Sequence, residues 1–332
     1  MYRRSTRIFE ILGRKKPSDV SVASHADFQT RLVKVVDALP VAEAGLPYSI
    51  DFGNERMISV ITNDDRNAVT YPFLYQYQYK NARTMISIPF EGLEQYEYSG
   101  LIRPTFVFSI GRCGSTLLSS LMTAFGHCSI SEPDIFTVLA RLTAEEQQLI
   151  GPQGLQMLVR RATEAFVRQG DGEVSIKLRS HCNTIAGRMV KAVPESRTIF
   201  ILRDRISWAK SRYRVFGEDP RTLAKMYRNG IQTYDQLFRL GSRPKLVWYE
   251  ELAQDPISVL KKLGVAPMLE EERISAMVDE VLTKDAQEGT AVARNRYNER
   301  RLSEEMLRDF ESEWSAIVPH QLIERHGISL PY

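Results

Sequence analysis

The stretch Phe106–Met122, FVFSIGRCGSTLLSSLM, decides how this chain folds. It begins with a short apolar run, continues through a loop with two glycines, and ends in apolar residues at helical spacing. A strand, a glycine loop and a helix in this order present backbone N–H groups to a phosphate. A nucleoside triphosphatase loop has the form GxxxxGK[ST], but here Gly114 occupies the place of the lysine. The stretch therefore predicts an anion-binding loop that works without that lysine.

Further strand patterns follow the loop, and each leads into a polar turn and a helical pattern. They are VSIKL at 174–178, RTIFIL at 197–202 and KLVWYEEL at 245–252. Strands that alternate with helices indicate a parallel sheet covered on both faces. We therefore expect an α/β fold with three layers, a parallel sheet flanked by helices as in P-loop nucleoside triphosphatases. Ligands should bind at the carboxyl ends of the strands.

Residues 1–98 have a different pattern and predict an N-terminal accessory region beside a catalytic domain at 99–332. The segments MISVIT at 57–62 and TYPFLYQYQYKNARTMISIPF at 70–90 predict strands of a small antiparallel unit. The segment ADFQTRLVKVVDALP at 26–40 predicts a helix. The region either covers the active site on the acceptor side or forms an oligomer contact, and the sequence leaves the oligomeric state open.

Composition restricts the class of protein. The 332 residues are 43% hydrophobic and 26% charged, with a formal net charge of +3 and no apolar run long enough for a membrane span. The basic residues are scattered among acidic ones, which argues against a nucleic-acid surface. Three cysteines without a CxxC pair favour a reducing compartment, so we expect a cytoplasmic protein. We expect Cys113, inside the loop, to be a small structural residue instead of a nucleophile.

A second anion site is expected after the strand at 197–202. Arg203 stands at the carboxyl end of this strand, and a helix beginning near Asp204 places Ser207, Ser211 and Arg214 on one face. Arg203 and Ser211 could then hold one phosphate from two sides. Two anion sites on neighbouring strands suit a nucleoside that is phosphorylated at two positions.

Three segments carry a resemblance to a known family. FVFSIGRCGSTLLSSLM is similar to a 5′-phosphosulfate loop, and IFILRDRISWAKSRY at 199–213 is similar to a 3′-phosphate segment. LVWYEELAQDPISVLKKLGV at 246–265 resembles a late strand–helix element, with these matching residues: Tyr249, Glu250, Leu252, Asp255 and Pro256. In order and spacing, over roughly residues 103–300, the segments resemble the sulfotransferases that use 3′-phosphoadenosine 5′-phosphosulfate.

The resemblance implies a donor, a product and an acceptor. The donor is 3′-phosphoadenosine 5′-phosphosulfate, the product is adenosine 3′,5′-bisphosphate, no metal is needed, and the acceptor is a small molecule with a hydroxyl or amine. The donor-binding residues that it implies are Arg112, Cys113, Gly114, Ser115, Thr116, Arg203 and Ser211. Cys113 stands where the family commonly has serine. Arg294 or Arg296 would cover the 3′-phosphate, unless their segment is simply a solvated basic loop.

The resemblance also implies catalytic roles. Arg112 and Lys177 would stabilise the charge that builds on the bridging oxygen, although Lys177 could instead emerge from its strand into water. One branch of the family has a histidine base two residues after the strand lysine, where this chain has Arg179, and His181 is offset by two. Another branch uses a glutamate, which favours Glu132 as the general base.

Other readings of these residues stay open. Glu132 could form a structural ion pair, and Asp134 and His127 are weaker candidates for the base. A kinase or nucleoside triphosphatase of the same fold would need a loop lysine and a magnesium-binding carboxylate at a strand end. A catalytically silent protein would bind adenosine 3′,5′-bisphosphate without turnover. All three share one fold, so the fold cannot choose between them.

Overall fold

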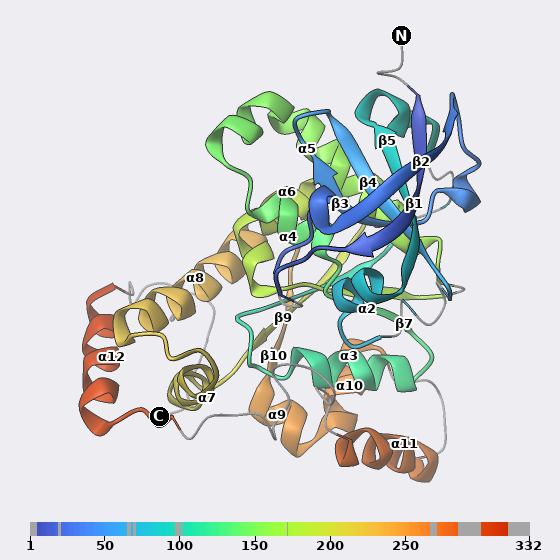
Figure 1. The fold of residues 1–332 in the computed structure, drawn as a ribbon. Coiled ribbons are helices and arrows are strands. Elements are labelled where there is room, and N and C mark those ends of the chain that lie inside the picture. The colour runs from blue at the N-terminus through green and yellow to red at the C-terminus, as the bar shows by residue number, and fades with distance from the viewer. Residues whose placement is uncertain are drawn as a thin grey trace. The chain divides into compact units, whose positions relative to one another are not determined.

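A computed structural model describes residues 5–18, 21–64, 68, 71–96, 100, 102–170, 172–265, 271–284 and 300–317. The chain divides into two compact units, Met1–Thr105 with His127–Ser196, and Phe106–Gly126 with Arg197–Tyr332. A five-stranded antiparallel sheet and a five-stranded parallel sheet are present (Figure 1). The predicted α/β fold with strands in the N-terminal region is confirmed, whereas the predicted domain boundary at residue 98 stays a prediction.

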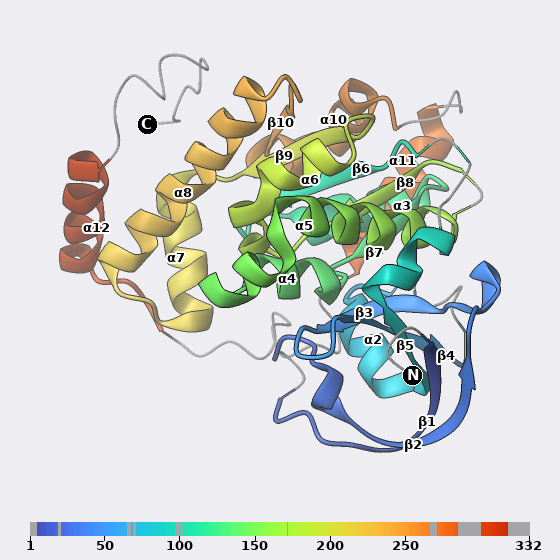
Figure 2. The ribbon, with the colours of Figure 1, turned by 90° about the horizontal axis from the view of Figure 1, so that it is seen from above.

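The N-terminal sheet has the strand order β2-β1-β5-β4-β3. Its strands are β1 (Thr6–Arg14), β2 (Phe28–Val36), β3 (Leu46–Asp51), β4 (Arg56–Thr62) and β5 (Ala82–Pro89). Adjacent strands are antiparallel, and register shifts interrupt the β1–β2 pair twice and the β3–β4 and β4–β5 pairs once each. Helix α2 (Leu74–Asn81) contacts β4 and β5 and lies inside the curve of this sheet (Figure 2). Short 3₁₀ helices lie along the same region: η1 (His25–Asp27), η2 (Val41–Glu43) and η3 (Phe90–Tyr96).

Two predictions for this region were wrong. The predicted helix at 26–40 is strand β2, because Val33, Val35 and Val36 are β-branched and favour extended backbone. Val33 is 64% exposed, so its apolar spacing reflected no buried helix face. The Tyr-rich segment at 71–79, predicted as a strand, forms most of α2.

Tyr and Gln alternate along α2, and such a period of two residues is typical of a half-buried strand. In the helix Gln76 and Gln78 are buried beside the tyrosines, so the polar positions do not mark a solvent face. The Gln78 amide nitrogen donates a hydrogen bond to the Pro47 carbonyl at 3.1 Å, so the donor of this side chain is paired inside the protein. Tertiary contacts therefore override the sequence pattern here.

The parallel sheet has the order β10-β9-β6-β8-β7. Its strands are β6 (Thr105–Ser109), β7 (Cys128–Ser131), β8 (Val174–Lys177), β9 (Arg197–Leu202) and β10 (Lys245–Trp248). The strands expected at 106–110, 174–178 and 197–202 are present, whereas the one expected at 245–252 ends at Trp248, because Tyr249 begins helix α9. β7 pairs with β8, and β9 with β10, both in parallel.

Helices follow the strands of the parallel sheet. They are α3 (Ser115–Ala124), α4 (Asp134–Ala140), α5 (Ala144–Val167), α6 (Ala186–Ala192), α7 (Arg205–Phe216), α8 (Pro220–Arg239), α9 (Tyr249–Gln254), α10 (Pro256–Leu263), α11 (Glu271–Thr283) and α12 (Glu304–Ile317), with 3₁₀ helix η4 (Ser180–Ile185) before α6. In the second unit, α12 lies beside α8 (Figure 1). Among the described helices, none has the length and apolar character needed to cross a membrane.

Candidate functional site

The predicted phosphate loop joins β6 to α3 and takes an unusual backbone path. Gly111, Arg112 and Gly114 all have positive φ, at 71°, 55° and 80°. Gly114 is the N-cap of α3 and supplies no side-chain cap, so the loop backbone leads directly into the first turn of the helix. A Cβ at Gly114 would lie 2.5 Å from Cδ2 of Tyr249, so the packing also requires glycine here. The loop has the geometry of an anion-binding turn.

Contacts from two later segments hold the loop. The Trp208 indole Nε1 donates to the Gly111 carbonyl at 2.8 Å, and the Arg203 Nη1 donates to the Arg112 carbonyl at 3.3 Å. Trp208 is fully buried on α7 and packs edge-on against Tyr227 of α8, with ring centroids 5.3 Å apart. The helix after β9 therefore fixes the path of the phosphate loop.

Arg203 lies at the carboxyl end of β9, as predicted. Its guanidinium is stacked 4.3 Å from the ring centroid of Tyr249, and its Nε lies 4.0 Å from Oε1 of Glu250. That same carboxylate oxygen accepts the Asp204 amide at 3.1 Å. Tyr249 and Glu250, the residues of the late strand–helix resemblance, thus position the strand-end arginine beside the loop.

Ser211 lies on α7, which begins where the sequence places it. The Asp204 side chain accepts a hydrogen bond from the Ser207 amide at 2.8 Å and caps the helix. Ser211 is half-buried, one helical turn after Ser207 and on the same face. In the second unit, the structure brings together Arg112, Gly114, Tyr249 and Arg203, which we call the loop cluster.

The remaining predicted donor residues lie within the loop. Ser115 and Thr116 begin α3 and are buried, and Cys113 is fully buried. A buried Cys113 fits the expected structural role. Arg294 and Arg296 lie outside the described residues, so their predicted contact with the 3′-phosphate stays a prediction.

A second cluster lies in the first unit, at the ends of β7 and β8. Lys177 is the last residue of β8, and its side chain is 1% exposed. Its Nζ lies 2.6 Å from Oε1 of Glu132 and donates to the Ser131 hydroxyl at 3.2 Å. The ring centroid of Phe73 lies 5.1 Å from the same nitrogen. The alternative in which Lys177 emerges into water is therefore wrong.

Glu132 differs from an ordinary loop glutamate in its backbone. Its φ is 56°, in a region that residues with a side chain seldom occupy, and its amide donates to the Lys177 carbonyl at 2.7 Å. The side chain is 16% exposed, so the carboxylate is paired with Lys177 without being sealed from solvent. Strained backbone that holds a partly open carboxylate is common at functional sites.

The other candidates for the base have different surroundings. His181 is exposed on η4, and the His127 ring lies 3.6 Å from Glu173. Asp134 is fully buried and lies 2.8 Å from Nη1 of Arg179. Of these four groups, Glu132 alone is both partly open and paired with the strand lysine.

Three residues of this cluster were missed as partners by sequence reasoning. Phe73 and Tyr75 come from a segment read as a strand, and Tyr75 lies 4.7 Å from the guanidinium carbon of Arg179. The sequence did contain a signal for Arg179. Arg179 lies two residues after Lys177, Asp134 lies two residues after Glu132, and the strands that precede Arg179 and Asp134 pair in parallel. That matched spacing could have indicated the Arg179–Asp134 pair.

The chain is similar to several solved sulfotransferases. Sulfotransferase STF9 from Mycobacterium avium aligns over 66% of this chain and 78% of its own, at 16% identity and a TM-score of 0.41. A retinol dehydratase in complex with androsterone and the inactive cofactor PAP aligns over 64% and 80%, at 14% identity and a TM-score of 0.41. The sulfotransferase domain of the Synechococcus PCC 7002 olefin synthase aligns over 70% and 98%, at 17% identity and a TM-score of 0.38.

Comparison with protein-family models found no match, and comparison with curated proteins found none either. All three TM-scores are below 0.5, so the likeness to these structures carries no argument about the function of this chain.

Proposed function

We propose that the chain is a sulfotransferase that moves a sulfuryl group from 3′-phosphoadenosine 5′-phosphosulfate to a hydroxyl or amine of a small acceptor. The observation that carries the proposal is the hydrogen bond from Arg203 to the Arg112 carbonyl, which ties a strand-end arginine to a phosphate loop without lysine. A donor with one phosphate at each end of its ribose needs two cationic positions of this kind.

The residues of the loop cluster fit such a donor. The absence of a side chain at Gly114 and the start of α3 leave backbone N–H groups for the 5′-phosphosulfate. Arg203, stacked on Tyr249, and Ser211 would hold the 3′-phosphate. The donor supplies the sulfuryl group, and the loop needs no lysine because no triphosphate is hydrolysed.

Transfer would follow the loose, in-line path of phosphoryl transfer, where alignment and charge stabilisation carry catalysis. The acceptor oxygen or nitrogen forms the new bond to sulfur, and the bond from sulfur to the bridging oxygen of the 5′-phosphate breaks. The acceptor proton passes to Glu132, and adenosine 3′,5′-bisphosphate leaves with the electron pair. Negative charge on the departing phosphate calls for cations, which are Arg112 and Lys177 in this proposal.

The Lys177–Glu132 pair suggests how proton transfer to Glu132 is linked to cleavage of the bond between sulfur and the leaving phosphate. Before transfer, the Lys177 charge is matched by Glu132, 2.6 Å away. When Glu132 accepts the acceptor's proton it becomes neutral, and the Lys177 charge is then unopposed as the leaving phosphate becomes more negative. The pair would thus deliver positive charge at the moment of bond cleavage.

The test is turnover of the ³⁵S-labelled donor without magnesium, with 4-nitrophenol, an aliphatic alcohol and an aliphatic amine as probe acceptors. We expect labelled product and adenosine 3′,5′-bisphosphate in equal amounts, and a loss of about 100-fold or more in Glu132→Gln. Glu173→Gln is the matched control, because it removes another partly exposed carboxylate of the same unit and should leave the rate unchanged. Magnesium-dependent hydrolysis of ATP, with no turnover of the sulfated donor, would contradict the proposal.

A further inference from the structure

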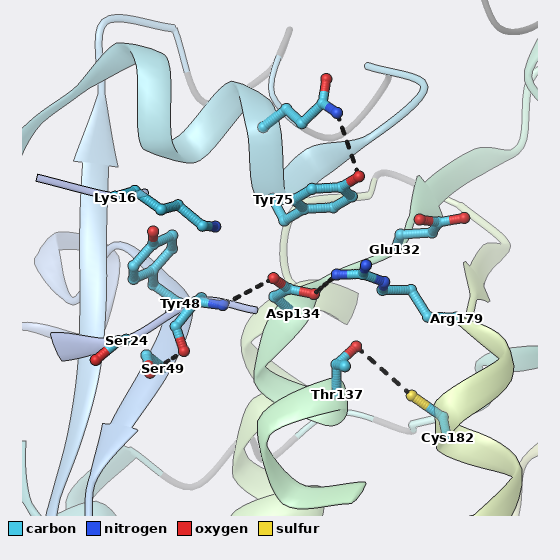
Figure 3. Close-up of polar contacts among 12 residues, drawn as sticks. Lys16, Ser24, Tyr48, Ser49, Tyr75, Glu132, Asp134, Thr137, Arg179 and Cys182 are labelled. Carbon is cyan, nitrogen blue, oxygen red and sulfur yellow. Dashed lines mark hydrogen bonds and ion pairs between the residues drawn. The ribbon is translucent and has the colours of Figure 1, made fainter. Parts of the chain in front are cut away.

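Charged side chains of alternating sign form a row that includes the candidate base, and Figure 3 shows four of them, Lys16, Asp134, Arg179 and Glu132. In order they are Asp27, Lys16, Asp134, Arg179, Glu132 and Lys177. All six belong to the first compact unit, and the first two come from the N-terminal sheet region. The row carries as many positive as negative charges. It connects the accessory region electrostatically with Glu132.

Asp134 is the centre of this row. Its side chain is fully buried, its Oδ1 accepts from Arg179 at 2.8 Å, and its Oδ2 accepts from the Ala23 amide at 2.9 Å. Burial raises the pKa of Asp134, and the charges of Arg179 and Lys16 oppose that effect. Cations on both sides of the carboxylate therefore offset part of the cost of burying it.

The N-terminal end of the row is equally enclosed. Lys16 is 1% exposed, its Nζ lies 4.0 Å from Asp27, and the rings of Tyr75 and Tyr79 lie 5.6 and 5.5 Å away. Tyr48 donates to Asp27 at 2.6 Å. Buried charge pairs can often be replaced by apolar residues without loss of stability, so folding alone is a poor reason for this arrangement.

Arg179 joins the row to the base. One face of its guanidinium lies against Tyr75, and Nη1 is bound by Asp134 (Figure 3). Burial opposes its charge, while Asp134 first and then Glu132 raise the pKa of Arg179. Glu132 accordingly faces Lys177 at the end of β8, Arg179 after it, Tyr75 from α2, and Asp134 across Arg179.

We propose that Arg179 and Asp134 are positioning residues for Glu132: Asp134 holds Arg179 beside the base and compensates part of its charge. The proposal rests on the proposed function in naming Glu132 the base. It gives the N-terminal region a part in the chemistry, because Ala23 and Lys16 fix the carboxylate that fixes Arg179.

The proposal predicts opposite effects for its two members. Asp134→Asn removes the carboxylate that binds Nη1 of Arg179 and so adds positive charge beside Glu132, which should lower the midpoint of the Glu132 carboxyl titration by about one pH unit. Arg179→Met removes a cation from beside Glu132, so the midpoint should rise by a similar amount. Arg179→Lys, which keeps the charge, should restore most of the wild-type midpoint.

The measurement is ¹³C NMR of protein labelled at the glutamate carboxyl carbons, with Glu132→Gln to assign the resonance. It needs neither donor nor acceptor, and Asp219→Asn, in the second unit, is the control that should change nothing. Opposite shifts in Asp134→Asn and Arg179→Met support the proposal, and an unchanged midpoint in both overturns it. If one variant fails to fold, the other decides: a shift in the stated direction supports the proposal and an unchanged midpoint overturns it.

Two further readings separate this proposal from the proposed function. The acid limb of the pH–rate profile for labelled donor turnover should move with the NMR midpoint, while KM for the donor stays unchanged. A merely structural role would lower the rate at every pH without moving that limb. If the wild-type protein does not bind adenosine 3′,5′-bisphosphate, the proposed function fails, whereas the NMR titration still decides whether the row controls Glu132.

Discussion

Replacing Gly114 by alanine tests the physical basis of the phosphate loop. Gly114 has a φ of 80°, and the left-handed conformation costs a residue with a Cβ about 1–2 kcal/mol. The new Cβ would also lie 2.5 Å from the ring of Tyr249, and overpacking of this kind costs about 1–3 kcal/mol. Gly114→Ala should therefore destabilise the protein by about 2–5 kcal/mol.

Gly264→Ala is the matched control for this change. Gly264 has a φ of 73°, but a Cβ there would meet no atom within 4 Å, so only the conformational cost of about 1–2 kcal/mol applies. The difference between the two variants isolates the contact with Tyr249. In the double variant Gly114→Ala/Tyr249→Ala the clash is absent, so its free-energy cost should disappear and only the cost of losing the Tyr249 ring should be added.

Urea unfolding followed by tryptophan fluorescence is a suitable assay. The chain has three tryptophans, Trp208, Trp248 and Trp314, and all lie in the second unit with Gly114 and Gly264. The signal therefore reports the unit that both substitutions perturb. If Gly114→Ala were no more destabilising than Gly264→Ala, the claim that the loop packs directly against Tyr249 would be refuted.

Three more outcomes are expected. Lys177→Met removes the ion-pair partner that lies 2.6 Å from Glu132, so it should cost about 3 kcal/mol in urea unfolding followed by circular dichroism, and a smaller cost would show that the ion pair is solvent-screened. Burial raises the pKa of Cys182 to about 12, so iodoacetamide at pH 8 should label the half-buried Cys128 and spare Cys182 in the native protein, as read by mass spectrometry; equal labelling would contradict the burial. Asp219 caps α8 by accepting from the Thr222 hydroxyl and amide, which lower its pKa, so Asp219→Ala should cost about 1 kcal/mol. This stabilisation should be complete above the ordinary aspartate pKa and fade as the pH falls through the lowered one, whereas Asp219→Asn should show no such pH dependence.

The sequence predicted the parallel sheet well because its strands are short apolar runs between polar turns. The strand at 197–202 and the helix start near Asp204 were both placed correctly, since Arg203 and Asp204 mark the change from a buried strand to a capped helix. A strand that is buried on both faces is a continuous apolar run without solvent-facing polar residues, so it can be recognised from the sequence.

The N-terminal region was harder to predict for an equally physical reason. Strand β2 exposes Leu32 and Val33, and α2 buries Gln76 and Gln78, so in both elements the apolar pattern and the burial disagree. A polar partner for Lys177 was predictable because a lysine in an apolar strand needs one. Its partners Phe73 and Glu132 come from distant segments, and only the fold brings them together.

We propose that the loop cluster binds a nucleoside bisphosphate without a metal. The decisive experiment is calorimetric titration with adenosine 3′,5′-bisphosphate in the absence of magnesium, for wild type, for Arg203→Ala and for Arg197→Ala at the other end of β9. We expect metal-independent binding that Arg203→Ala weakens by about 2 kcal/mol, or ~30-fold in Kd, and that Arg197→Ala leaves unchanged. No binding of this ligand, together with magnesium-dependent binding of ATP, would contradict it.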